Sequence, residues 1–191
     1  MHSSTRFDII AIGGSAGSLS VVARLLKALP GEMDTPVVLI MHRLKNVSSE
    51  LNRLLAFGRP IQEPEDKERM KAGHIYLAPQ NYHLLLEADG TFSLDYSELV
   101  HYSRPAIDES FYSIADAYGK RALGILLSGA NADGAEGLAR IVKNGGAGIV
   151  QDPMEAEFRI MPQAAIDMSA DIKIMKTDEI ISFIKDQYHT K

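Results

Sequence analysis

Three polar residues of this sequence carry side chains that together can perform nucleophilic hydrolysis. Ser15, His42 and Asp133 each follow a short run of mainly aliphatic residues that predicts a buried β-strand. A serine hydroxyl can act as the nucleophile and a histidine as the base, while a carboxylate holds the histidine in the required orientation. In an open parallel sheet the carboxyl ends of the strands form one edge, where ligands bind. We therefore expect these three side chains to meet at that edge.

The segment around Ser15 matches G-x-S-x-G in the strand–turn–helix context that this motif requires. A sharp turn would expose the serine hydroxyl, and the backbone N–H of Ala16 would face the oxyanion that develops on an attacked carbonyl. A second N–H donor is expected from the loop before Asp133, at Ala130. The alternative is a turn that binds phosphate or only packs. A dinucleotide site is a weaker interpretation, because its motif would need glycine in place of Ser15.

The other two residues also have structural interpretations. His42 lies one βα crossover after Ser15, which usually places consecutive parallel strands side by side, but a lone histidine at a strand end is more often a hydrogen-bonded rim residue. Asp133, with Glu136 three residues later, is typical of a helix N-cap in a capping box. A carboxylate has enough acceptor sites to fill both roles. The rival orienting carboxylates are Asp108, Glu109 and Asp152.

No metal or cofactor site is predicted. The sequence contains no cysteine, which excludes disulfides, thiolate zinc sites and iron–sulfur clusters. His74, His83 and His101 have no recognisable metal-ligand spacing. We interpret these three histidines as structural or substrate-side residues.

The hydrophobic pattern predicts an α/β fold: a doubly wound, mostly parallel sheet with helices on both faces and an antiparallel hairpin at one edge. Buried strands are predicted at residues 7–12, 37–41, 74–79, 122–127 and 148–150, and hairpin strands at 82–86 and 92–96. Helices are predicted over residues 19–29, 47–55, 107–118, 135–143 and 180–188. Asp108 is expected to be the N-cap of the third of these helices.

Composition and charge set the broad class of the protein. The 191 residues, 46% hydrophobic and 24% charged, suit one globular domain over residues 1–191, with 1–6 as a disordered tail. A net charge of −5 without a dense cluster of lysine and arginine argues against nucleic-acid binding. No apolar run approaches the roughly 20 residues that span a bilayer, and the N-terminus lacks the apolar stretch of a signal peptide. We expect no membrane insertion and a cytoplasmic location.

Six segments, in order along the chain, resemble the catalytic domain of the CheB family, the chemotaxis-receptor protein-glutamate methylesterases. The segments are 12–18, 41–42, 73–79, 104–108, 127–137 and 161–162. The segments span residues 12–162, and the resemblance covers roughly residues 8–188, which is most of the chain. Six matching segments in the same order make a chance similarity unlikely.

The resemblance implies that Ser15 is the nucleophile, His42 the base and Asp133 the residue that orients the base. It implies hydrolysis of glutamate methyl esters on the cytoplasmic helices of methyl-accepting chemotaxis receptors, with release of methanol. Many members of the family also deamidate receptor glutamines, and no cofactor is implied. Arg104 and Asn131, which lie in two of the matching segments, are expected on the substrate side.

Departures from the family pattern keep other functions open. The family's first motif commonly reads Gly-Ala-Ser-Thr-Gly-Gly, whereas this chain has Gly14, Ala16 and Ser18 in place of the alanine, the threonine and the last glycine. The phosphoacceptor receiver domain of typical members is absent from this sequence, so the chain is either trimmed or a free-standing esterase regulated differently. The alternatives are a non-catalytic receptor- or ligand-binding module on the same fold and an esterase that acts outside chemotaxis.

Overall fold

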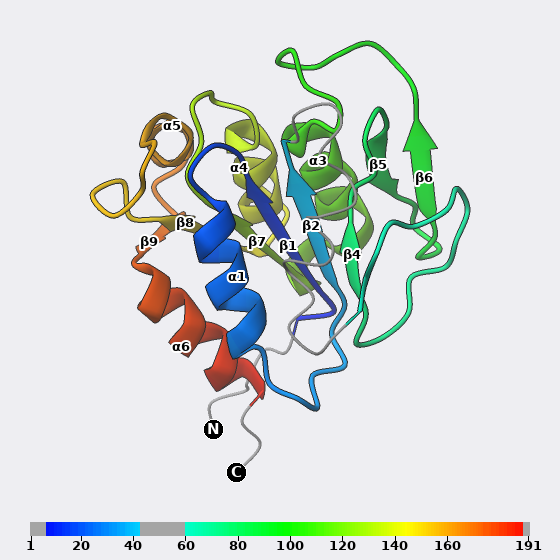
Figure 1. The fold of residues 1–191 in the computed structure, drawn as a ribbon, viewed down its shortest axis with the longest axis horizontal. Helices are drawn as coiled ribbons and strands as arrows, with labels where there is room; N and C mark the ends of the chain where they lie inside the picture. The colour runs from blue at the N-terminus through cyan, green and yellow to red at the C-terminus, as the bar shows by residue number, and fades with distance from the viewer. Residues whose placement is uncertain (1–6, 43–59, 189–191) are drawn as a thin grey trace.

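The centre of the fold is a sheet of seven parallel strands with helices packed on both of its faces (Figure 1). The computed structural model describes residues 7–42 and 60–188. The predicted tail at 1–6 and the predicted helix at 47–55 lie outside the described residues. The predicted α/β class is confirmed, since every strand pairing within this sheet is parallel.

The strands of the sheet follow the order β3-β4-β2-β1-β7-β8-β9. They are β1 (Ile9–Gly14), β2 (Val37–Met41), β3 (Ile61–Gln62), β4 (Ile75–Leu77), β7 (Ala122–Leu126), β8 (Ala147–Gln151) and β9 (Lys173–Met175). β1 lies in the middle and pairs with β2 on one side and β7 on the other, with Gly14 opposite Met41. The three strands that precede the candidate site residues are therefore neighbours.

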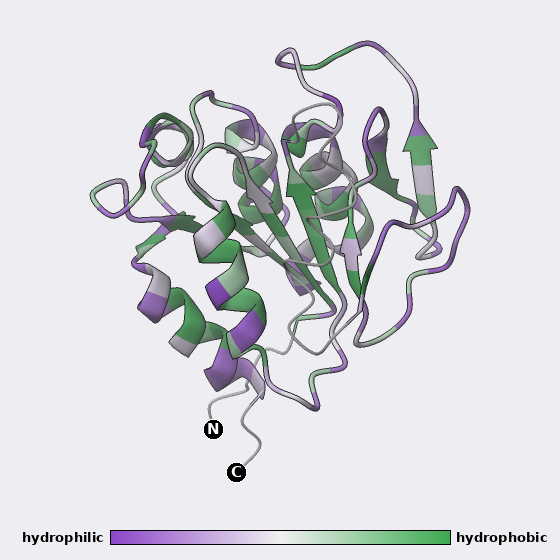
Figure 2. Cartoon of the chain, viewed as in Figure 1, coloured by the Kyte–Doolittle hydropathy of each residue, from purple (hydrophilic) through white to green (hydrophobic). Residues whose placement is uncertain are grey.

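Helices cover both faces of the sheet, which confirms the doubly wound arrangement. They are α1 (Leu19–Ala28), α3 (Ile107–Tyr118), α4 (Ala135–Lys143), α5 (Ile160–Met168) and α6 (Thr177–Tyr188), with a short 3-10 helix η1 (Gly119–Arg121). Ile10 and Ile12 of β1 pack in one hydrophobic cluster with α1 and α6, whereas Ile9 and Ala11 pack in another with α3 and α4. In Figure 2 the central strands are mostly hydrophobic and the helices carry hydrophilic segments among hydrophobic ones.

The predicted hairpin is confirmed, and it forms a small sheet of its own. Strand β5 (His83–Leu86) pairs antiparallel with β6 (Phe92–Asp95), and within the described ranges neither strand joins the parallel sheet. Leu84 and Phe92 belong to the same hydrophobic cluster as α3, and the Phe92 ring lies 4.6 Å from the ring of Tyr76 in β4. The strand beside β4 at the sheet edge is β3, which has two residues and so no readable hydrophobic pattern.

Two predicted helix caps are wrong. Helix α3 begins at Ile107 with Ala106 as its N-cap, so Asp108 lies inside the first turn. Helix α4 has Gly134 as its N-cap, with a φ of +93°, so the N-cap residue itself has no side chain that could cap this end. Each aspartate instead accepts hydrogen bonds from the first turn of the other helix, because the two helix N-termini face one another.

Helices α3 and α4 come into close contact at Gly137. A Cβ added to this glycine would lie 2.5 Å from the Cβ of Phe111 and 3.0 Å from the backbone oxygen of Asp108. Real Cβ atoms do not approach other heavy atoms so closely, and the neighbour here is partly backbone, which cannot swing away. The absence of a side chain at Gly137 therefore sets the separation of the two helices whose N-termini hold the candidate site.

We expect Gly137→Ala to lower the free energy of unfolding by about 1–3 kcal/mol, as overpacking does. A decrease in the free energy of unfolding is informative, because replacing glycine by alanine in a helix interior normally increases it by about 1 kcal/mol. Urea denaturation measures the change. The matched control is Gly31→Ala, where an added Cβ meets no heavy atom within 4 Å and the effect should stay within about 0.5 kcal/mol. A Gly137→Ala protein as stable as the wild type would contradict this account.

Candidate active site

The structure brings Ser15, His42 and Asp133 into one hydrogen-bonded row. Ser15 directly follows β1, His42 directly follows β2, and Asp133 lies in the loop between β7 and α4. The Ser15 Oγ is 3.1 Å from His42 Nδ1, and His42 Nε2 is 2.6 Å from Asp133 Oδ2. Because β1 pairs with both β2 and β7, the three side chains converge at the carboxyl edge of the sheet.

The hydrogen-bond partners fix the tautomer of His42. Asp133 is an acceptor when ionised, so we assign the imidazole proton to Nε2, which donates to Asp133. The lone pair of Nδ1 then faces the hydroxyl of Ser15 and can accept its proton. The side chain of His42 is 12% exposed and that of Asp133 fully buried. The arrangement has the geometry of a nucleophile, a base and an orienting carboxylate.

Asp133 is held as an anion by the N-terminus of a helix other than its own. The backbone N–H of Ile107 donates to Oδ2 at 2.7 Å, and that of Asp108 donates to Oδ1 at 2.9 Å. Burial by itself would raise the pKa of Asp133, but the hydrogen bonds from His42 and from these two N–H groups outweigh it and hold the pKa below its ordinary value. The carboxylate therefore keeps its charge well into the acid range.

The turn that carries Ser15 is closed by Ser18. The backbone N–H and the hydroxyl of Ser18 both donate to the carbonyl oxygen of Ser15, at 3.1 Å and 2.6 Å. Gly17, at the third position of this turn, has a φ of +77°, which side-chain-bearing residues rarely adopt. From the neighbouring strand end, Ser128 donates its hydroxyl to the carbonyl oxygen of Ala16 at 2.8 Å.

Two of the departures from the family's first motif compensate for one another. A Cβ added at Gly14 would lie 2.6 Å from the hydroxyl oxygen of Ser18 and 2.8 Å from its Cβ. The space that an alanine side chain would take at position 14 is thus filled here by the serine side chain at position 18.

The two backbone groups expected to face an oxyanion both lie at the surface of this edge. Ala16 and Ala130 are exposed, and neither N–H donates to any residue in the ranges that the structure describes. The neighbouring Gly129 N–H, in contrast, donates to the carbonyl oxygen of Phe158 at 3.1 Å. Within the loop expected to supply the second donor, Ala130 is therefore better placed than Gly129.

Arg104 and Asn131, the expected substrate-side residues, differ in their surroundings. Arg104 lines a cavity of about 370 Å³ that also reaches His42. Its guanidinium lies over the ring of Tyr96 at 3.9 Å and donates to the backbone oxygen of Ser97. Asn131 uses its side-chain oxygen to accept the N–H of Asp133 at 3.1 Å, which places it in the support of the loop.

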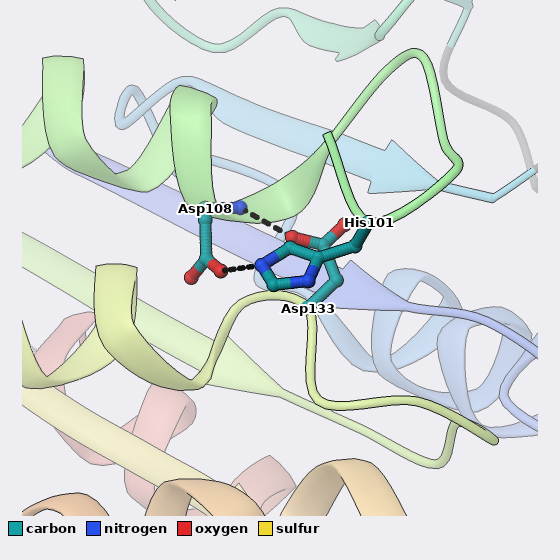
Figure 3. A group of neighbouring side chains, drawn as sticks. All are labelled: His101, Asp108 and Asp133. Carbon is teal, nitrogen blue, oxygen red and sulfur yellow. Dashed lines mark hydrogen bonds and ion pairs between the residues drawn. The ribbon is translucent and has the colours of Figure 1, made fainter. Parts of the chain in front are cut away.

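Sequence reasoning missed the part that His101 and Asp108 play around Asp133. His101 Nε2 lies 3.1 Å from Asp108 Oδ2, and one ligand-type atom of each of the three residues lies within 4.8 Å of the others (Figure 3). Such a set could suit a cation, but both oxygens of Asp133 already accept N–H donors, as does Asp108 from Gly137 at 2.7 Å. We therefore describe a hydrogen-bonded network. The only sequence signal for this network is that Asp108 is one of the rival orienting carboxylates.

Gly14→Ala should displace the Ser15 turn, lower the free energy of unfolding by about 1–3 kcal/mol and slow any reaction of the Ser15 hydroxyl. The double variant Gly14→Ala, Ser18→Gly should recover part of both losses, because it frees the space that the new methyl group needs but removes the hydrogen bond from the Ser18 hydroxyl to the Ser15 carbonyl oxygen. Urea denaturation and the rate of Ser15 labelling by a fluorophosphonate measure the two effects. Strictly additive losses in the double variant would rule out the compensation.

Comparison with known proteins identifies the family. Residues 10–184 match the sequence family described as CheB methylesterase. A relative named putative protein-glutamate methylesterase/protein-glutamine glutaminase, from Leptospira interrogans, is 39% identical over 176 residues, which cover 91% of each chain. The chain spans about half of some longer relatives: it covers 51% of one protein-glutamate methylesterase/protein-glutamine glutaminase from Methanospirillum hungatei, at 34% identity over 93% of this chain.

The fold agrees with these sequence matches. The crystal structure of the CheB methylesterase catalytic domain of Thermotoga maritima superposes with a TM-score of 0.86 and 27% sequence identity, covering 94% of this chain and 98% of that one. Sequence and fold thus agree over nearly the whole of the described chain. The chain belongs to the CheB methylesterase family.

Proposed function

We propose that this protein is a serine hydrolase that removes methyl esters from glutamate side chains of methyl-accepting chemotaxis receptors. The observation that carries the proposal is the row of hydrogen bonds from Ser15 through His42 to Asp133. In a member of this family, such a row at the carboxyl edge of the sheet supports ester hydrolysis with Ser15 as nucleophile, His42 as base and Asp133 as the orienting group. We also propose that residues 1–191 form a single catalytic domain.

In the first half-reaction, Nδ1 of His42 takes the proton of the Ser15 hydroxyl while the oxygen attacks the ester carbonyl carbon. The N–H groups of Ala16 and Ala130 donate to the oxyanion, and such donors contribute about 3 kcal/mol each to the transition state. The bond to the methoxy oxygen then breaks, and His42 returns the proton to that oxygen. Methanol leaves, and the glutamyl group stays bonded to Ser15.

In the second half-reaction, water takes the place of methanol. Nδ1 of His42 removes a proton from the water as its oxygen attacks the acyl carbon. The bond to Ser15 Oγ breaks, and His42 returns the proton to this oxygen. The products are the free serine and the glutamate carboxylic acid, which releases its proton to solvent and becomes the carboxylate. Asp133 stays ionised throughout and stabilises the imidazolium that forms in both halves.

Deamidation of receptor glutamines is a second activity of the same centre. The relatives from Leptospira interrogans and Methanospirillum hungatei are named as glutaminases as well as methylesterases. The chemistry differs only in the leaving group: His42 gives its proton to the amide nitrogen, so ammonia leaves in place of methanol. The subsequent hydrolysis of the acyl group is identical.

The cavity beside His42 supports a protein substrate that reaches the site from solvent. Arg104 and Glu98 line this cavity together with the amide side chain of Asn81. Cytoplasmic receptor helices are the substrate that we propose, which places the reaction in the cytoplasm. No helix among the described residues is long and apolar enough to cross a bilayer.

We expect Ser15→Ala to abolish methanol release from methylated receptor membranes, with a fall in kcat of at least about 10⁴-fold. The Oγ of Ser15 is half-buried at the end of a rigid turn, so its loss should leave the melting temperature nearly unchanged. A fluorophosphonate should label the wild type stoichiometrically at Ser15 and should not label the variant. Methanol release by Ser15→Ala would remove Ser15 as nucleophile. An unlabelled wild type would favour a binding module.

Activity should fall in acid, because protonation of His42 removes the base that Ser15 needs. Asp133 does not cause this fall, since its pKa is held below its ordinary value and the carboxylate stays ionised there. The dependence of kcat/KM on pH, measured on methylated receptor, gives the acid limb. A rate that is flat from acid to alkaline pH would contradict the role of His42.

A further inference from the structure

Helices α3 and α4 exchange caps at their N-termini. Asp133, which precedes α4, accepts the N–H groups of Ile107 and Asp108 in the first turn of α3. Asp108, in α3, makes the reciprocal contact, because its carboxylate accepts the N–H of Gly137 in the first turn of α4 at 2.7 Å. Each helix start is thus held by a carboxylate that belongs to the other segment, and both contacts act on the position of Asp133.

His101 completes this arrangement from the solvent side. Its ring lies against the carboxylate of Asp108, while the backbone N–H of Asp108 is directed at Asp133 (Figure 3). The side chain of His101 is 42% exposed, whereas that of Asp108 is 2% exposed. Among the described residues, the buried carboxylate therefore has one side-chain hydrogen-bond partner, and this partner is open to solvent.

The ionised form of Asp108 is costly to the fold. Burial raises the pKa of this carboxyl to about 6, and the nearby charge of Asp133 acts in the same direction. The N–H groups of Gly137 and Gly134 and the partner His101 oppose this shift and do not cancel it. A carboxyl whose pKa is raised by folding stabilises the folded state at pH values below the pKa that the group has in the unfolded chain. This stabilisation is lost as the pH rises through about 6.

We propose that Asp108 is a positioning residue for the catalytic row, and that His101, whose ring contacts its carboxylate at 3.1 Å, favours the charged form of that carboxylate. The proposal rests on the proposed function. Two carboxylates and an imidazole with ligand atoms within 4.8 Å of one another bring a second negative charge next to Asp133. Such a charge helps to stabilise the imidazolium that His42 becomes in each transition state, at the expense of folding stability.

The other charged and titratable groups near Asp108 are few among the described residues. Tyr112, one turn further along α3, donates its hydroxyl to Glu136 of α4 at 2.8 Å. This hydrogen bond, together with burial and the charge of Asp108, raises the pKa of Tyr112, so the phenol stays neutral throughout the working range. Among these groups, the carboxyl of Asp108 itself is the one whose pKa is raised to about 6.

The test compares Asp108→Asn with wild type over pH 5–8. The amide keeps an oxygen for the Gly137 N–H but carries no charge. We expect kcat of Asp108→Asn to be about 3–10-fold lower at pH 8, a range that one nearby charge at intermediate dielectric can produce, with KM within about two-fold. Below pH 6 the ratio of the kcat of Asp108→Asn to that of the wild type should approach one, because Asp108 of the wild type is then itself neutral. A ratio of one at pH 8, a ratio independent of pH, or a change in KM alone would overturn the proposal.

The matched control is Asp116→Asn, which removes a charge from the same pair of helices away from the row. Asp116 of α3 accepts three hydrogen bonds from Arg140 of α4, one from Nε at 3.1 Å and two from Nη2 at 2.9 Å and 3.1 Å. This variant should give a kcat ratio to wild type that is close to one at every pH. A loss of kcat equal to that of Asp108→Asn would mean that any weakening of the α3–α4 contact slows the reaction, and would overturn the proposal.

A stability measurement separates positioning from simple packing. Asp108→Asn should raise the melting temperature at pH 8 by about 2–4 °C, the shift that roughly 1 kcal/mol produces in a chain of this size. At pH 5 it should leave the melting temperature unchanged. If the variant melts at a lower temperature at both pH values, Asp108 serves packing alone and the proposal fails.

His101→Gln tests the second half of the proposal. Glutamine can donate a hydrogen bond to Asp108 but cannot carry a positive charge, so the pKa of Asp108 should rise above about 6. The pH at which ionisation of Asp108 alters kcat should increase together with this pKa. The carboxyl signal of Asp108, followed by ¹³C NMR as pH is varied, reads this shift without any turnover. An unchanged titration in His101→Gln would remove His101 from the proposal.

The same measurements distinguish a failure of this inference from a failure of the proposed function. The rate at which a fluorophosphonate labels Ser15 reports the state of the row without requiring a receptor substrate. If wild type is labelled but releases no methanol, the methylesterase proposal fails, and the comparison of Asp108→Asn with wild type is made on labelling rates. If methanol is released and the ratio does not depend on pH, only the inference about Asp108 fails.

Discussion

A fully buried carboxylate that keeps its charge is the constraint on which the candidate site depends. Burial works against the ionised form of Asp133, and the N–H groups of Ile107 and Asp108, together with His42, reverse this effect. The ion in turn fixes the tautomer of His42 and leaves the lone pair of Nδ1 facing Ser15. The orientation of the base is thus determined by the N-terminus of α3, which has no side chain in the row.

The serine side of the row depends on backbone geometry. β1 lies between β2 and β7, so the turn that follows it is flanked on both sides by strand ends. Ser18 and Ser128 donate to the carbonyl oxygens of Ser15 and Ala16, which fixes the orientation of these two carbonyl groups. The hydroxyl of Ser15 is then presented on a rigid support, and rigid support is what a nucleophile needs to react in one geometry.

Those features of the fold and site that depend on hydrophobic pattern and local chemistry could be predicted from the sequence. The runs that became β1, β2 and β7 were readable because they are buried on both faces, and the parallel order placed Ser15 beside His42. The two caps were predicted wrongly, because an aspartate near a helix start looks the same whether it bonds to its own helix or to another. The pairing of His101 with Asp108 and the complementary volumes of Gly14 and Ser18 could not be predicted, since both exist only after the chain has folded.

The hydrogen bond between His42 and Asp133 joins residues that are 91 positions apart in the chain. Neither the base nor the nucleophile is oriented until β7 has paired with β1 and α3 has docked behind the sheet. In a partly synthesised or partly refolded chain, Ser15 is therefore not activated, even where secondary structure has already formed. Serine reactivity during refolding would therefore report that these particular long-range contacts have formed.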